Sequence, residues 1–135
     1  MTNSEKKSRL NQFRILNRRI DQTKLEIARW EEIATKITPQ YSDMPKAHKA
    51  GDKVQNAVVE MVRLKEQLEQ QQSDALMQQS QIKEWINSLQ DDRFRDLLWY
   101  HYICGLDWKE VAEKMHFDLH YIYFLHKQAL KALQP

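Results

Sequence analysis

The chain has 135 residues and a net charge of +2; 30% of its residues are charged, while only 2 are glycine and 3 are proline. This composition disfavours a β-rich fold and argues against a membrane-spanning protein, since helix-forming residues dominate and no run approaches ~20 apolar residues. The single cysteine, Cys104, excludes an internal disulfide, and the N-terminal stretch lacks the apolar core of a signal peptide. We therefore expect an all-α, cytoplasmic protein.

Residues 1–90 carry two heptad patterns, which predict two long helices. In the first helix, one seam repeats every seven residues, at Phe13, Ile20, Ile27 and Ala34, and a companion seam lies three residues further on: Leu16, Thr23, Trp30 and Ile37. The second helix shows the same repeat at Val54, Met61, Leu68, Ala75, Ile82 and Leu89, with Ala57, Leu64 and Trp85 in its companion seam. Between them, residues 38–53 hold two prolines and Gly51, a composition typical of a loop. We predict a long antiparallel helical hairpin, a coiled-coil-like arm, with its loop near residues 38–53.

The second heptad becomes polar at Gln71 and Gln78. A helix that continues through this stretch would have little to bury within the arm, so the stretch is a solvated helix, a hinge or a place where another chain packs. The arm either only closes its own core or also self-associates as a homodimer. Its residues Arg14, Arg18 and Arg19 fall at helical spacing and form either a solvated face or a contact for an anionic partner.

Residues 91–135 have the pattern of three short helices that end in a helix-turn-helix, a unit that many proteins place in the major groove of DNA. Asp107 is followed three residues later by Glu110, a capping box that predicts the start of a helix. Asp118 predicts the start of the last helix. The last helix has apolar residues at helical spacing: Ile122, Leu125, Ala129 and Leu133.

Aromatic residues supply most of the large side chains that this small C-terminal domain can bury. Four of them are predicted to form its core: Trp99, Tyr102, Trp108 and Phe117. Cys104, in an apolar run before a turn, is predicted to be a buried structural thiol. Ile122 and Leu125 are expected to face inward on the last helix. Its outward positions are then expected among their neighbours: Leu119, His120, Tyr123 and Phe124.

Three consecutive motifs in this domain resemble region 4 of bacterial sigma factors and of their phage-borne relatives. They are Tyr-Ile-Cys-Gly-Leu at 102–106, Trp-Lys-Glu-Val-Ala at 108–112 and Leu-His-Lys-Gln-Ala-Leu at 125–130. Upstream, residues 33–38 and 51–58 resemble the helical arm of small phage and mobile-element proteins of Gram-positive bacteria, the ArpU/RinA-type late transcriptional regulators. The resemblance covers nearly the whole chain and implies a DNA-binding transcriptional regulator in a bacterial host cell.

The resemblance also implies which residues contact DNA. Five are base-proximal candidates: Leu119, His120, Tyr121, Tyr123 and Phe124. Four lysines are candidate phosphate contacts: Lys109, Lys114, Lys127 and Lys131. Double-stranded DNA is the implied partner, and RNA polymerase is a second one that the arm could hold. No membrane partner is expected.

Three properties of the domain depart from the sigma-like pattern. His116 replaces the glycine that is common in the turn before the last helix, where a positive φ is usual. Residues 91–135 carry six Lys/Arg against seven Asp/Glu, which weakens stand-alone binding because nucleic-acid affinity depends on phosphate neutralisation. Leu119 and Phe124 stand where polar residues would read bases, and such side chains can only touch a thymine methyl or a sugar. The alternative is therefore a protein-interaction module that keeps the helix-turn-helix fold but docks a protein partner instead of DNA.

The sequence shows no pattern of catalytic or metal-binding residues. It has no recognisable nucleophile–base pair, Gly-rich phosphate loop or pair of carboxylates in an apolar frame, so we expect no enzyme and no cofactor. His116 and His120 lie four residues apart around Asp118, but they straddle the predicted turn, so no metal site is expected. His126 is expected to pack or hydrogen-bond at the surface of the last helix.

Overall fold

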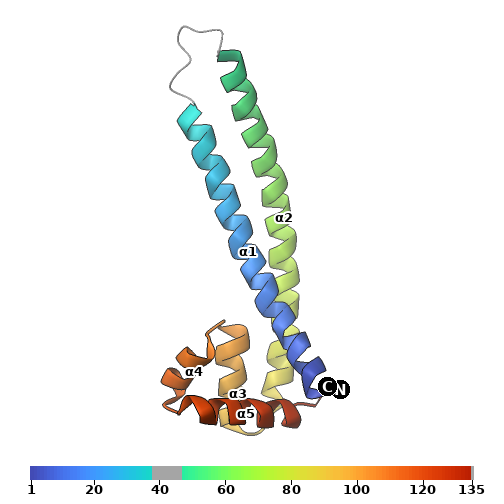
Figure 1. The fold of residues 1–135 in the computed structure, drawn as a ribbon. Coiled ribbons are helices and arrows are strands. Elements are labelled where there is room, and N and C mark those ends of the chain that lie inside the picture. Colours follow the sequence, from blue (N-terminus) through green and yellow to red (C-terminus); the bar gives the residue numbers. More distant parts are fainter. Residues whose placement is uncertain (38–46, 135) are drawn as a thin grey trace. The chain divides into compact units, whose positions relative to one another are not determined.

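The computed structural model describes residues 1–37 and 47–134, and every regular element within them is a helix. In chain order the elements are α1 (Asn3–Ile37), α2 (Ala47–Asn87), α3 (Asp92–Leu98), the π-helix η2 (Trp99–Ile103), α4 (Trp108–Met115) and α5 (Leu119–Ala132) (Figure 1). The predicted all-α fold is confirmed. None of these helices is both long enough and apolar enough to span a membrane.

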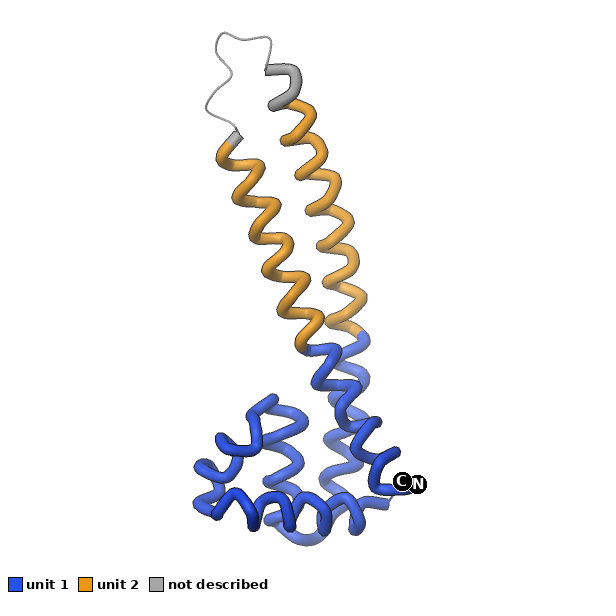
Figure 2. The backbone as a smooth tube through the Cα atoms, in the orientation of Figure 1, with its two compact units in different colours: residues 1–17, 74–135 blue, residues 18–73 orange. Residues whose placement is uncertain are grey.

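The chain divides into two compact units (Figure 2). Unit 1 comprises residues 1–17 and 74–135, and unit 2 comprises residues 18–73, so α1 and α2 each contribute to both. This division differs from the boundary that we expected after residue 90. The N-terminal part of α1 and the C-terminal part of α2 belong with the C-terminal helices. Together they and the segment after α2 bury a set of apolar residues in unit 1: Leu10, Phe13, Ala75, Ile82, Ile86 and Leu89.

Unit 2 consists of parts of α1 and α2, which lie side by side and run in opposite directions (Figure 1). The buried residues that the structure describes in this unit come from the predicted heptad seams and their companion seams: Ile20, Thr23, Ile27, Ala57 and Leu64. Other seam positions, such as Val54 and Met61, are half-buried. A single pair of helices covers each seam from one side only, which explains this partial burial.

The structure corrects the end of the loop that we expected at residues 38–53. Residues 38–46 lie outside the described part of the chain, but α2 already begins at Ala47 and includes Gly51. Gly51 is exposed, and no atom lies within 4 Å of the position where a Cβ would be. A single exposed glycine costs a helix only about 1 kcal/mol relative to alanine. A helix of 41 residues tolerates that cost.

The polar stretch around Gln71 and Gln78 is helical, because α2 continues through it to Asn87. In unit 2, Gln71 Oε1 is buried and has no hydrogen-bond partner among the described residues. In unit 1, Leu76 and Met77 are exposed. The polar part of the second heptad is therefore a helix with largely solvated side chains.

The core of unit 1 lies among α3, η2, α4 and α5, which pack against one another. Its most deeply buried side chains include Leu97, Leu98, Tyr102, Val111, Ile122, Leu125 and Leu133. Polar contacts join the N-terminal part of α1 and the C-terminal part of α2 to this core. Lys6 Nζ donates to the carbonyl oxygen of Leu130 at 2.8 Å, and Trp85 Nε1 donates to the carbonyl oxygen of Gln134. Residues of α1 and α2 therefore hold the end of α5 and the residues that follow it.

Candidate nucleic-acid interface

The turn between α4 and α5 has the local geometry that the sequence predicts. The capping box is formed: Glu110 N donates to Asp107 Oδ1 at 2.8 Å, and Asp107 N donates to Glu110 Oε1 at 3.2 Å. His116 ends α4 in the left-handed conformation, with φ 58°. Asp118 is the N-cap residue of α5 by its backbone angles, but its side chain accepts no hydrogen bond from that helix. The capping box thus starts α4, and the left-handed His116 ends it before α5 begins.

One face of α5 points to solvent, and we call it the α5 face. It consists of His120, Phe124, Lys127 and Lys131, which are all exposed. These residues share one side of the helix because their spacing of four, three and four residues matches the helical repeat. The prediction that Ile122 and Leu125 face inward is confirmed, since their exposed fractions are 0% and 1%.

The other candidate contacts lie around this face with varying exposure. Tyr123 is 46% exposed, and its ring stands edge-on against Trp108 at a centroid distance of 6.3 Å. Leu119 and Tyr121 are half-buried. Of the remaining lysines, Lys109 and Lys114 are exposed on α4. The predicted site residues therefore come together on α4 and α5, with Phe124, at 54%, as the most exposed large apolar residue of α5.

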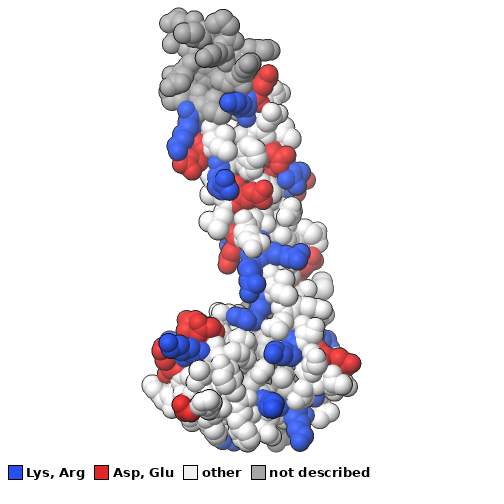
Figure 3. All heavy atoms as spheres, in the orientation of Figure 1, with Lys and Arg blue, Asp and Glu red and all other residues white. Residues whose placement is uncertain are grey.

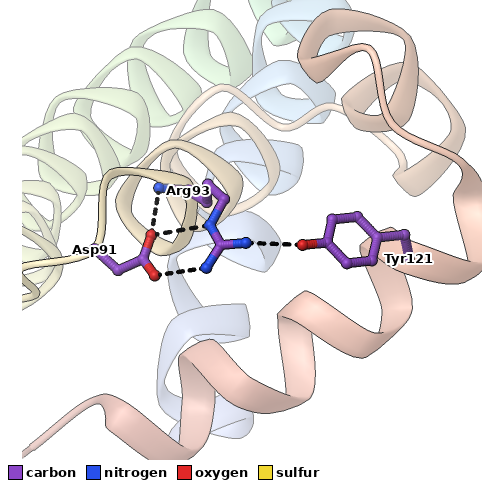
Figure 4. A network of polar contacts seen from close by, with 3 residues as sticks. All are labelled: Asp91, Arg93 and Tyr121. Carbon is purple, nitrogen blue, oxygen red and sulfur yellow. Dashed lines mark hydrogen bonds and ion pairs between the residues drawn. The ribbon is translucent and has the colours of Figure 1, made fainter.

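A polar network from α3 holds Tyr121 beside the α5 face (Figure 4). Arg93 Nη1 donates to the hydroxyl of Tyr121 at 2.8 Å. The same guanidinium donates to Asp91 Oδ1 at 3.3 Å and to Asp91 Oδ2 at 3.0 Å. These bonds from Arg93 hold the pKa of the Asp91 carboxyl below its usual value. Because Asp91 also caps α3 by accepting from Arg93 N at 2.9 Å, the network is anchored to the start of that helix.

Tyr121 in turn packs against two aromatic rings. Its ring is stacked on Phe124, at a centroid distance of 6.2 Å and an interplanar angle of 21°. It also meets Phe117 edge-on, at a centroid distance of 5.0 Å. The ring of Phe124 is exposed and yet stacks on a neighbour whose hydroxyl is held from α3.

A cluster of aromatic and histidine side chains lies on the inner side of α5. His101 stacks on Trp108 at a centroid distance of 3.6 Å, and Trp108 also contacts His126 at 4.4 Å. Tyr102 Oη lies 2.7 Å from His126 Nε2, within hydrogen-bonding distance. His126 is 8% exposed, so it hydrogen-bonds as predicted, but in the interior and not at the helix surface.

Both buried histidines are neutral at physiological pH. His101 Nδ1 lies 2.7 Å from the carbonyl oxygen of Leu106, which can only accept, so Nδ1 carries the proton. Burial, and then the nearby charge of Arg14, lowers the pKa of His101 to about 4. Burial, and then His101, lowers the pKa of His126 to about 4. Burial also raises the pKa of Tyr102. The cluster is therefore an uncharged support for α5.

Arg14 has a structural role that the sequence did not show. Its Nη1 lies 3.4 Å from His101 Nε2, and its Nη2 donates to the carbonyl oxygen of Gly105 at 3.4 Å. Gly105 has φ 77°, a backbone conformation that glycine adopts readily and that residues with a Cβ disfavour. Arg14 thus joins α1 to the turn before α4, and the solvated-face and anionic-partner interpretations of this residue give way to an internal contact.

The π-helix η2 explains two wrong burial predictions. A π-helix closes its turn with a bond from residue i to residue i+5, here Cys104 N to Trp99 O at 3.0 Å. The extra residue in the turn shifts the inward face, so that His101 and Tyr102 are buried. Trp99, expected in the core, is 42% exposed, and Cys104, expected to be buried, is exposed. Tyr102 is a core residue as predicted, whereas Trp108 and Phe117 are only half-buried.

Charge is unevenly distributed around the α5 face. α5 itself holds two lysines and no acidic residue. Two acidic residues of the domain, Asp91 and Asp92, form ion pairs with Arg93 and Arg95. On the face of unit 1 seen in Figure 3, basic and acidic side chains are scattered among many uncharged atoms. The described residues also contain no group of three or more His, Cys, Asp or Glu side chains that could hold a metal ion.

Comparison with known protein families identifies a match over most of the chain. Residues 38–134 match the model of a family described as a protein of unknown function, DUF1492. Searches of curated proteins and of solved structures find no match.

Proposed function

The chain belongs to the DUF1492 family, whose function is unknown, and from the α5 face we propose that it is a transcriptional regulator that binds double-stranded DNA. In this proposal α4, the turn and α5 form a helix-turn-helix, and α5 enters the major groove. The observation that carries the proposal is the α5 face itself. It is exposed along the helix, carries Lys127 and Lys131, and includes no acidic residue.

The order of residues along the α5 face suits a reading helix. His120 and Phe124 lie in its N-terminal half, which is the part that contacts base edges in helix-turn-helix proteins. Lys127 and Lys131 follow in the C-terminal half, where they can reach phosphates on either side of the groove. Lys109 and Lys114 on α4 are further phosphate contacts in this proposal.

Four lysines predict a weak, salt-dependent interaction. With about four phosphates neutralised, the logarithm of the association constant falls with the logarithm of salt concentration with a slope of about −4. A weak module gains most from binding two half-sites at once. We propose that a second copy of the chain supplies the other module, because unit 2 exposes an apolar group on α2 that its own core does not use: Val58, Val59 and Val62.

The test is binding to DNA selected from a random duplex library, measured by fluorescence anisotropy over a range of salt concentrations. The variant with both Lys127→Ala and Lys131→Ala should bind more weakly to every sequence and should reduce the salt slope by about two. Lys24→Ala, which removes an exposed lysine from unit 2, is the matched control and should leave affinity unchanged. Failure to bind any duplex at low salt, or equal losses in both variants, contradicts the proposal.

A second candidate function is docking of a protein partner by the same face. The observation that favours it is the exposure of two large aromatic residues, Tyr123 and Phe124. The partner to test is purified bacterial RNA polymerase, because the resemblance to sigma region 4 implies it. In this case Phe124→Ala should abolish the interaction, whereas the loss of Lys127 and Lys131 should have little effect on it.

A further inference from the structure

The N-terminal half of the α5 face has few groups that can read a base edge. Guanidinium and amide side chains make the bidentate contacts that distinguish guanine and adenine. The α5 face contains neither kind, since its four residues are His120, Phe124, Lys127 and Lys131. Gln128 is half-buried at the border of the face. The largest exposed side chain in the N-terminal half of the α5 face is therefore the aromatic ring of Phe124.

The ring of Phe124 is held in place by its neighbours. It stacks on Tyr121 at a centroid distance of 6.2 Å. The hydroxyl of Tyr121 accepts from Arg93 at 2.8 Å, and Arg93 is fixed by two further bonds to Asp91 (Figure 4). A side chain that is already ordered loses less entropy when it binds, so its contact contributes more to affinity and to selectivity.

We propose that Phe124 reads the C5 methyl group of thymine, and that Tyr121 and Arg93 are positioning residues for its ring. This inference rests on the proposed function, because it requires α5 to lie in the major groove. There, thymine is the base that offers an apolar group, and phenylalanine is one of the side chains that contact it. A protein partner of this face is less favoured, because the lysines of α5 and its lack of acidic residues complement phosphates.

The direct experiment compares the selected duplex with versions in which single thymines are replaced by uracil. This change removes only the methyl group and leaves base pairing intact. We expect the protein to bind about fourfold more weakly when the thymine that Phe124 contacts is replaced, the loss that corresponds to burial of one methyl group. Replacements elsewhere in the duplex should have little effect. If every uracil duplex binds as tightly as its thymine counterpart, the inference is wrong, although DNA binding itself would stand.

Variants of Phe124 assign the contact to that residue. Phe124→Ala should bind the thymine and uracil duplexes equally, because the ring that distinguishes them is gone. Phe124→Leu keeps an apolar side chain and should retain part of the preference. Phe124 is 54% exposed, so both variants should fold, and thermal unfolding followed by circular dichroism verifies this. A variant that lacks the ring but keeps the full thymine preference contradicts the inference.

Tyr121→Phe tests the positioning role. It keeps the ring that stacks on Phe124 and removes only the hydroxyl that Arg93 holds. We expect the fourfold ratio between thymine and uracil duplexes to fall to about twofold. Tyr100→Phe, which makes the same change on η2 away from α5, is the matched control and should keep the ratio. A purely structural role for Tyr121 would lower stability and leave the ratio unchanged, and that outcome rejects the positioning role.

The three results separate failure of the inference from failure of the proposed function. Absence of binding to any duplex at low salt rejects both. Binding without a thymine preference rejects only the inference. Loss of a complex with purified RNA polymerase in Phe124→Ala, with no duplex bound by the unaltered protein, assigns the face to a protein partner instead.

Discussion

The hydroxyl of Tyr102 lies 2.7 Å from Nε2 of His126, and both side chains are buried in unit 1. Tyr102 belongs to η2 and His126 to α5, so this contact joins the π-helix to the proposed reading helix. Each group satisfies the hydrogen-bonding requirement of the other in an interior where an unpaired polar atom is costly.

Tyr102→Phe should destabilise the protein by about 1–3 kcal/mol, because it leaves His126 Nε2 buried without its partner. The free energy of unfolding can be measured by urea denaturation. Tyr123→Phe is the control, and we expect it to change stability by less than about 0.5 kcal/mol because that side chain is exposed. Equal effects of the two substitutions would show that the buried contact contributes nothing.

Stability should decrease as the pH falls from about 6.5 to about 4. His101 and His126 have pKa values of about 4 in the folded protein, below the ordinary value of 6.5. Between these values the unfolded chain binds protons that the folded protein does not, so protonation favours unfolding. The loss is on the order of 3 kcal/mol for each histidine, and it is complete below pH 4.

Urea denaturation at a series of pH values measures this dependence. His126→Asn removes one of the titrating groups, so the difference between the unaltered protein and the variant should narrow as the pH falls through the same window. Carboxylates titrate in both proteins, and their contribution cancels in the difference. A constant difference from pH 7 to pH 4 would contradict the prediction.

Asp107→Ala should destabilise the protein by about 1 kcal/mol, because the Asp107 side chain caps α4 by accepting from Glu110 N at 2.8 Å. Asp118→Ala is a matched control at the start of α5. The Asp118 side chain accepts no hydrogen bond from α5, so its loss should have a smaller effect. Thermal unfolding compares the two variants, and a larger effect at position 118 would be the opposite of the expected order.

Lys6→Met should weaken the end of α5. The Lys6 ammonium is buried and donates at 2.8 Å to the carbonyl oxygen of Leu130, an acceptor in the last turn of α5 that also accepts the weaker, 3.3 Å bond from Leu133 N. Loss of this charge-assisted bond should cost about 1–3 kcal/mol. Lys7→Met is the control, because Lys7 is the next residue in the chain and its side chain is exposed. Amide hydrogen exchange should quicken in the C-terminal turns of α5 for Lys6→Met only, and unchanged exchange there would contradict the prediction.

Sequence patterns predicted well those features that depend on residues a few positions apart. The capping box of Asp107, the left-handed His116 and the inward face of Ile122 and Leu125 all follow from local geometry. The heptad repeats likewise identified the buried residues of unit 2, because one helix face is determined by residue spacing alone. The outward position of Phe124 follows from the same spacing.

Contacts between residues far apart in the chain could not be predicted in this way. Arg93 and Tyr121 are 28 positions apart, and Lys6 and Leu130 are 124 positions apart. The π-helix also escaped prediction, because the packing of His101 and Tyr102 selects it against an α-helix that the same residues could form. The sequence by itself therefore determined the all-α class, the starts of α4 and α5, and the packed faces of unit 2 and of α5. Only the tertiary structure decided which side chains α1, α2 and η2 bring beneath α5, because burial and hydrogen bonding there depend on segments that meet only after folding.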